Sequence, residues 1–109
     1  MADERLALWV AVAACPGAAE ALDALADGPR SFLEIRRRMP VSRRELWRAL
    51  RTLAVEGALI RCEPGSWDGG ARRSTFVLTA GGHHLRRELA SLEVWVAVYE
   101  HFLHRPPRP

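Results

Sequence analysis

The sequence predicts a mainly α-helical domain with one small β-hairpin, and three observations carry this prediction. Apolar residues recur at helical spacing over most of the 109-residue chain. Two Ser-x-x-Glu motifs, which begin at Ser31 and Ser42, mark the starts of helices. Between residues 58 and 78 the helical spacing gives way to short apolar runs separated by turn formers. The length suits one domain of ordinary size.

Two helices are expected in the first quarter of the chain. Residues 2–14 are apolar nearly all round, which predicts a helix buried against other elements. Pro16 and Gly17 interrupt this helix. Because proline is tolerated in a first turn, Pro16 is expected to open the second helix. That helix should run to about Asp27, where a Gly-Pro pair ends it.

Two more helices are expected on either side of Pro40, over residues 31–39 and 42–56. Each starts with a serine followed three residues later by a glutamate, and in this capping box each side chain bonds the other residue's backbone N–H. At about 100° per residue, the leucines of the 42–56 helix share one side and four large residues the opposite side. These four are Arg44, Trp47, Arg48 and Arg51. The helix should therefore bury a leucine side and expose an arginine side.

A hairpin and one long helix are expected after residue 57. Residues 58–62 and 71–78 read as paired strands, joined by a turn-rich segment. Thr79 should cap a helix that runs to about His104 and is followed by a disordered tail, 105–109. Apolar residues of this helix recur at the alternating steps of a coiled coil. They are Leu85, Leu89, Leu92, Val96, Tyr99 and Leu103.

This order of elements is that of a winged helix-turn-helix, with residues 1–104 as a single domain. Residues 16–78 would form its core and residues 63–73 its wing, flanked by dimerisation helices over 2–14 and 79–104. In this fold one helix enters the major groove of DNA, and its exposed side chains reach the base edges. The 42–56 helix has the position and the arginines for that role.

Charge is unevenly distributed along the chain, which carries 16 Arg, no Lys and a net charge of +3. Residues 30–73 hold 11 Arg and five acidic residues, a balance of +6, and the remainder holds five Arg and eight acidic residues, a balance of −3. A basic centre favours a face that binds an anionic polymer. The alternative is a solvated basic surface with no partner.

The sequence gives little support to an enzyme, a metalloprotein or a membrane protein. It holds no Ser-His-Asp arrangement and no glycine-rich phosphate loop, so no catalytic residue, cofactor or metal ligand is expected. Two cysteines form neither a disulfide framework nor a zinc knuckle; Cys62 is expected in the core, and Cys15 is a candidate redox switch. No apolar run reaches the ~18 residues of a membrane span. The acidic start, unlike a secretory signal, predicts a cytoplasmic protein.

The chain resembles the HxlR-type winged-helix transcriptional regulators of bacteria, which share their scheme with PadR- and MarR-type regulators. The resemblance lies in two stretches, ALADGPRSFLEIRRRMPVSRRELWRALRTLAVEGALIR and STFVLTAGGHHL. The matching positions are Gly28, Phe32, Glu34, Ile35, Ser42, Leu46, Leu50, Leu53, Gly57, Leu59, Leu78, Thr79 and Gly81. The pair Cys15-Pro16 is similar to the cysteine-proline that begins many HxlR-type domains.

The resemblance implies a homodimeric transcription factor that binds double-stranded DNA at a roughly palindromic operator. The positions where such families contact DNA correspond to Ser42, Arg43, Arg44, Trp47, Arg48 and Arg51 in the helix and Arg72 and Arg73 in the wing. Trp67 and Asp68 would lie at the wing tip. Two interpretations of Trp47 stay open, a contact with DNA and packing against the preceding helix, and the second is favoured.

The first and last helices carry more apolar surface than one domain of this size needs, which predicts a dimer interface. Its residues would be Leu6, Trp9, Val10, Leu89, Leu92, Trp95, Val96, Tyr99, Phe102 and Leu103. Aromatic members of this set could instead line a pocket for a small-molecule effector. The alternative function is a winged-helix protein-interaction module that does not bind DNA.

Overall fold

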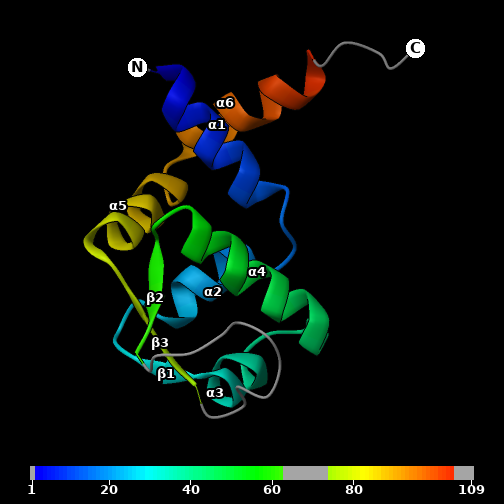
Figure 1. The fold of residues 1–109 in the computed structure, drawn as a ribbon. Helices are drawn as coiled ribbons and strands as arrows, with labels where there is room; N and C mark the ends of the chain where they lie inside the picture. Colours follow the sequence, from blue (N-terminus) through cyan, green and yellow to red (C-terminus); the bar gives the residue numbers. More distant parts are fainter. Residues whose placement is uncertain (1, 63–73, 105–109) are drawn as a thin grey trace.

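The computed structural model in Figure 1 describes residues 2–62 and 74–104 of the chain. The described helices and strands are α1 Ala2–Ala13, α2 Ala18–Ala24, β1 Arg30–Ser31, α3 Phe32–Arg37, α4 Arg43–Val55, β2 Leu59–Arg61, β3 Thr75–Leu78, α5 Ala80–Leu89 and α6 Leu92–Leu103. The mainly α fold with a small sheet confirms the predicted fold class. The predicted wing, residues 63–73, and the tail, residues 105–109, lie outside the described residues.

The hydrophobic core is centred on α2 and α4, which pack against each other. Figure 1 shows these two helices in the middle of the molecule, with α1 and α6 at one end and α3 toward the other. The largest fully buried side chains are Phe32, Phe76, Leu22, Leu25, Ile35, Leu46, Leu50, Leu53, Leu59, Leu85 and Val12. The leucine side predicted for the 42–56 helix is therefore the side that the structure buries.

The three described strands form an antiparallel sheet in the order β1-β3-β2. Leu59 pairs with Leu78, which confirms the predicted hairpin strands. Strand β1 was not predicted, because a strand of two residues is too short to show an alternating pattern. Cys62 follows β2 and is exposed, so the prediction that it belongs to the core is wrong.

Several helix boundaries differ from the predicted ones, and the second helix ends at Ala24 rather than near Asp27. The second helix starts at Ala18 rather than Pro16, because Gly17 adopts a left-handed φ of 85° that a helix cannot include. The prediction of a single long helix over 79–104 is wrong, because Ser91 is extended with ψ at 131° and separates α5 from α6. At this break, the Trp95 indole N–H donates a hydrogen bond to the carbonyl of Leu89 in the last turn of α5. The continuous coiled-coil-like seam is consequently divided between two helices.

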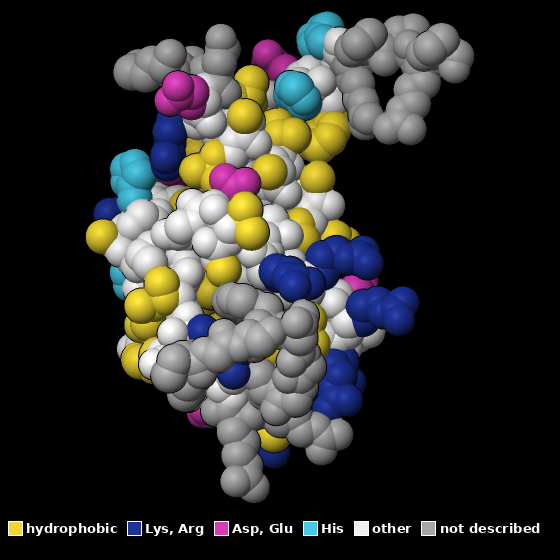
Figure 2. All heavy atoms as spheres, viewed as in Figure 1, with side chains coloured by type: hydrophobic (Ala, Val, Ile, Leu, Met, Phe, Trp, Pro, Cys, Tyr) yellow, Lys and Arg dark blue, Asp and Glu magenta, His cyan; other side chains and the backbone are white. Residues whose placement is uncertain are grey.

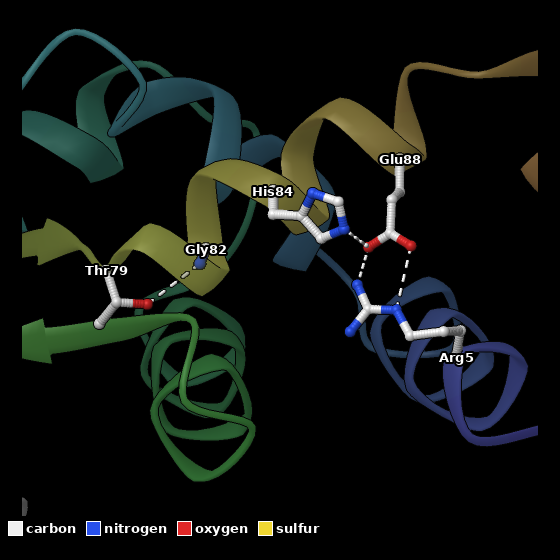
Figure 3. A network of polar contacts seen from close by, with 5 residues as sticks. All are labelled: Arg5, Thr79, Gly82, His84 and Glu88. Carbon is white, nitrogen blue, oxygen red and sulfur yellow. Dashed lines mark hydrogen bonds and ion pairs between the residues drawn. The ribbon is translucent and has the colours of Figure 1, made fainter. Parts of the chain in front are cut away.

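Helix α1 is tied to α5 by a charged pair (Figure 3). The Arg5 Nε–H donates to Glu88 Oε2 at 3.0 Å, and Arg5 Nη2 bonds the other carboxylate oxygen. The Nε2 atom of His84 lies 3.8 Å from the same carboxylate. Because Glu88 is mostly buried, this pair is better shielded from solvent than a surface ion pair.

Thr79 and Gly82 fix the start of α5 against the end of α4. The Thr79 hydroxyl donates to the carbonyl of Gly57 at 2.6 Å. It also accepts from the Gly82 N–H at 3.0 Å (Figure 3). Gly82 packs so closely on the backbone of Ala58 that an added Cβ would lie 1.8 Å from its carbonyl oxygen. This contact requires glycine and sets how α5 lies on the segment between α4 and β2.

Capping boxes begin both α3 and α4, as predicted. In α4, the Glu45 N–H donates to the Ser42 hydroxyl and the Ser42 N–H donates to the Glu45 carboxylate, both at 3.1 Å. Hydrogen bonds with the Ser42 backbone and side chain lower the pKa of Glu45 from its ordinary value of 4.5. Desolvation opposes this shift, and the charge of Arg48 adds to it. The pKa of Glu34 is lowered by the equivalent bonds with Ser31.

Of the described helices, none taken singly has the length and apolar character needed to cross a membrane. The segments Glu4–Ala13 and Ala18–Ala24 meet that requirement only together, and they are bent by 92° relative to each other.

Replacing Gly82 with Ala should lower the free energy of unfolding by about 2 kcal/mol or more, because the new methyl group would overlap a backbone carbonyl. The matched control is Gly81→Ala. A Cβ at Gly81 would meet its nearest atoms at 3.5 and 3.6 Å, which is ordinary van der Waals contact. The free energy of unfolding of this variant should therefore stay unchanged or rise by up to about 1 kcal/mol. Urea unfolding of both variants measures the difference, and equal stabilities would contradict the assigned contact.

Replacing Glu45 with Gln should destabilise the protein at neutral pH, and by progressively less as the pH falls. Glutamine preserves the capping hydrogen bond but removes the negative charge. Because the folded-state pKa of Glu45 is lowered, the charge stabilises the fold above the ordinary pKa of 4.5 and this contribution is lost as the pH falls through the lowered value. Urea unfolding of the wild type and the variant from about pH 3 to pH 7 measures how their difference in stability depends on pH. A difference in free energy of unfolding between the two proteins that does not vary with pH would refute the prediction.

Candidate nucleic-acid interface

The orientation of α4 follows from its buried side. Leu46, Ala49, Leu50 and Leu53 are fully buried. On a rigid helix, burial of one side fixes the direction of the other. Arg44, Arg48 and Arg51 are accordingly exposed along the opposite side, as predicted. We call these three residues the arginine face.

Trp47 lies within the same side of α4 but is partly buried. Its ring stacks on Phe32 of α3, with centroids 4.6 Å apart and planes inclined by 22°. The Trp47 ring also makes a T-shaped contact with Phe76 of β3, at a centroid distance of 6.1 Å and an angle of 78°. Trp47 therefore packs against the preceding helix, the interpretation favoured from sequence. The stack joins α3, α4 and the sheet beside the arginine face.

A hollow of about 290 Å³ opens on this side of α4, lined by Arg44, Trp47, Arg48 and Arg51. Figure 2 shows Arg side chains gathered along the edge of the molecule formed by α4. The hollow combines an aromatic floor with three guanidinium groups. Guanidinium groups bind phosphate and guanine through paired hydrogen bonds, so the site suits a polyanion with accessible base edges.

The other sequence-predicted positions are divided between described and undescribed parts of the chain. Ser42 and Arg43 are exposed at the start of α4, where the N-terminal end of the helix dipole also favours an anion. Arg72, Arg73, Trp67 and Asp68 lie outside the described residues.

Two supporting contacts were not predicted from the sequence. The first is the pair of rings, Phe32 and Phe76, that hold Trp47. Nothing in the spacing of Phe32 or Phe76 along the sequence indicates which ring either one meets. The second is a hydrogen bond from the Cys15 thiol to the Thr52 hydroxyl, 3.6 Å long, which links the end of α1 to α4.

A second exposed surface lies on α6. Leu92, Val96, Tyr99 and Leu103 share one side of this helix and are 79%, 46%, 64% and 61% exposed. We call these four residues the α6 stripe. The opposite side of α6 carries the buried residues Val94 and Val98, and α6 packs against α1.

The remaining residues predicted at the dimer interface differ in exposure. Trp95 and Phe102 border the α6 stripe and are partly exposed, while Leu6, Trp9 and Val10 on α1 are partly buried. Leu89 is buried within the core of the single chain. In Figure 2, hydrophobic side chains gather over α1 and α6, at a different part of the surface from the Arg side chains of α4.

Potential metal ligands do not cluster in the described residues. No three His, Cys, Asp or Glu side chains in residues 2–62 and 74–104 are placed to hold an ion together.

Two solved structures share this fold. One is described as a MarR-family transcriptional regulator from Enterococcus faecalis V583; it is 24% identical, with a TM-score of 0.54, over 78% of this chain and 76% of that one. The other is the C30AH42A mutant of Lactococcus lactis ZitR, 18% identical with a TM-score of 0.54, over 79% of this chain and 58% of that one. At these identities the likeness concerns the fold alone.

The sequence itself matches a family. No curated protein matches the chain. The sequence profile of the family described as HxlR-like helix-turn-helix, however, matches residues 19–103, from α2 to the last residue of α6. The match includes both the arginine face and the α6 stripe. The chain therefore belongs to the HxlR-like helix-turn-helix family.

Proposed function

We propose that the protein is a transcription regulator that binds double-stranded DNA through α4 and acts as a homodimer on a palindromic operator. Membership of a helix-turn-helix family supports the DNA-binding role. The single observation that carries the proposal is the arginine face, which is exposed on a helix whose opposite side is buried. A helix in the major groove needs this division, because it must be held by the scaffold on one side and reach the base edges on the other.

Each helix position has a proposed role. Arg44, Arg48 and Arg51 face the groove and bind bases or phosphates. Ser42 and Arg43 lie at the helix N-terminus, where phosphate is favoured by the helix dipole. Trp47 contributes mainly by position, because its stacking on Phe32 holds α4 at a fixed angle to α3. Arg72 and Arg73 are proposed to bind phosphates that flank the groove.

The α6 stripe supports the homodimer. Four large apolar side chains exposed at helical spacing are costly to leave in water, and a second copy of the chain would cover them. The stripe is a different surface from the arginine face, so dimerisation leaves α4 accessible. A two-fold symmetric dimer presents two copies of α4, which favours an operator with matching symmetry. A small-molecule effector is a further proposed partner.

Replacing Arg48 with Ala should weaken binding to operator DNA by roughly 5- to 150-fold if Arg48 reads a guanine. If it binds a phosphate instead, the slope of log K against log salt should fall by about 0.9. Fluorescence anisotropy with labelled duplex from the region upstream of the protein's gene, over several salt concentrations, separates the two outcomes.

The matched control for this experiment is Arg87→Ala, which removes one exposed arginine from α5, and it should bind like the wild type. Equal losses in the two variants would contradict the role of the arginine face. No binding by the wild type at ~50 mM salt, where even non-specific contacts should be measurable, would favour the protein-interaction module instead.

Replacing Val96 with Glu should convert the dimer to a monomer, because a charge in the centre of the α6 stripe would be buried without a partner. Sedimentation equilibrium should give twice the 12.2 kDa mass of one chain for the wild type and the single mass for the variant. Val55→Glu makes the same change at an exposed valine of α4 and should remain dimeric. A wild type that sediments as a monomer at micromolar concentration would disprove this interface.

A further inference from the structure

A cavity of about 280 Å³ lies where α2, α5 and α6 meet. It is separate from the hollow beside the arginine face, and the two share no lining residue. The cavity is bordered by one helix of the helix-turn-helix core and by the helix that carries the α6 stripe. A ligand in this cavity would therefore contact both the helix-turn-helix core and α6.

The inner lining of the cavity is apolar. Leu22 and Leu89 are buried there, and Ala19 contributes only a methyl group. Trp95 borders the cavity with a ring that is held in place, because its indole N–H is bonded to the carbonyl of Leu89. With its N–H already satisfied, the indole offers a ligand its aromatic surface. A flat aromatic molecule can pack or stack on such a surface.

A charged pair lies among the polar residues of the cavity. The Arg86 Nε–H donates to Asp23 Oδ1 at 2.9 Å, and both side chains are substantially exposed. Within the described part of the chain, Asp23 bonds the guanidinium through this one N–H, and a guanidinium carries five. The two charges cancel, so these residues do not favour a ligand with a net charge. The other N–H groups of Arg86 can donate to an oxygen of a neutral ligand.

We propose that this cavity binds a neutral aromatic molecule of one or two rings that carries an oxygen acceptor. The rings would occupy the apolar lining beside Trp95, and the oxygen would accept a hydrogen bond from Arg86. The size of the ligand is inferred from the volume of the cavity. This volume is just below the ~300 Å³ at which pockets for drug-sized ligands begin. The charge follows from Asp23, which would repel an anion close to Arg86.

Regulation by this ligand rests on the proposed function. The ligand would contact α2, which packs against α4, and α6, which carries the proposed dimer interface. A ligand in this cavity changes the affinity for DNA when it binds the DNA-binding conformation of the protein more tightly or more weakly than its other conformations. DNA and ligand must then change each other's affinity by the same factor.

The first test is made without DNA, so it does not depend on the proposed function. 2-Naphthol, a neutral two-ring molecule with one oxygen, is titrated into the ¹⁵N-labelled protein while the indole N–H signals are followed. Trp95→Phe identifies the Trp95 signal, which should shift saturably, whereas the Trp9 signal should not. The absence of a saturable shift up to about 1 mM, a weak-binding limit, would overturn the site.

Two variants make the test specific. Ala19→Leu places a larger side chain in the cavity and should lower the affinity for 2-naphthol at least about tenfold. Ala80→Leu makes the same change at an exposed position at the start of α5 and should bind like the wild type. The remaining indole signals report whether Ala19→Leu is folded. If it is not, Ala90→Leu fills the cavity from the C-terminal cap of α5. Unchanged binding in the folded filling variant would overturn the site.

The charge of the ligand and its coupling to DNA are tested separately. 2-Naphthoate has the same rings with a carboxylate and should bind more weakly than 2-naphthol; tighter binding would overturn the neutral class. Saturating 2-naphthol should change the affinity for operator DNA in the wild type but not in Ala19→Leu. If DNA binds and its affinity is unchanged by the ligand, the regulatory part fails while the proposed function stands.

Discussion

The burial of one side of α4 is the constraint on which the rest of the structure depends. Leu46, Leu50 and Leu53 are held in the core against α2, and a helix so anchored cannot rotate without exposing them. Losing a buried leucine contact costs about 2–5 kcal/mol, more than any exposed arginine could recover by turning inward. The arginine face is therefore exposed because of what lies behind it.

The contacts around α4 extend this constraint to the rest of the chain. Trp47 fixes the angle between α4 and α3 through its stack on Phe32. Gly82 and Thr79 fix the start of α5 against the backbone that follows α4. Through the tie between Arg5 and Glu88, α5 in turn holds α1, on which α6 packs. The elements that carry the arginine face and the α6 stripe are thus joined by short, specific contacts.

Local signals explain why so much of the helix-turn-helix core could be predicted from sequence. A capping box and the helical spacing of leucines are complete within a few residues, so α3, α4 and the side of α4 that faces outward followed directly. The break at Ser91 could not be found in this way, because the apolar spacing continues across it. It depends on packing that the spacing does not reveal, with Val94 and Val98 on the inner side of α6. The tie between Arg5 and Glu88 joins residues 83 positions apart, for which a single sequence holds no signal.

The most direct measurement of the central claim is NMR of the arginine Nε–H groups as operator duplex is added. Signals from Arg44, Arg48 and Arg51 should shift or broaden, because these groups would enter the groove, while those of Arg86 and Arg87 on α5 should stay in place. Shifts confined to α5, with the arginine face unaffected, would show that the duplex binds elsewhere. That result would contradict the proposal that the exposed side of α4 binds DNA.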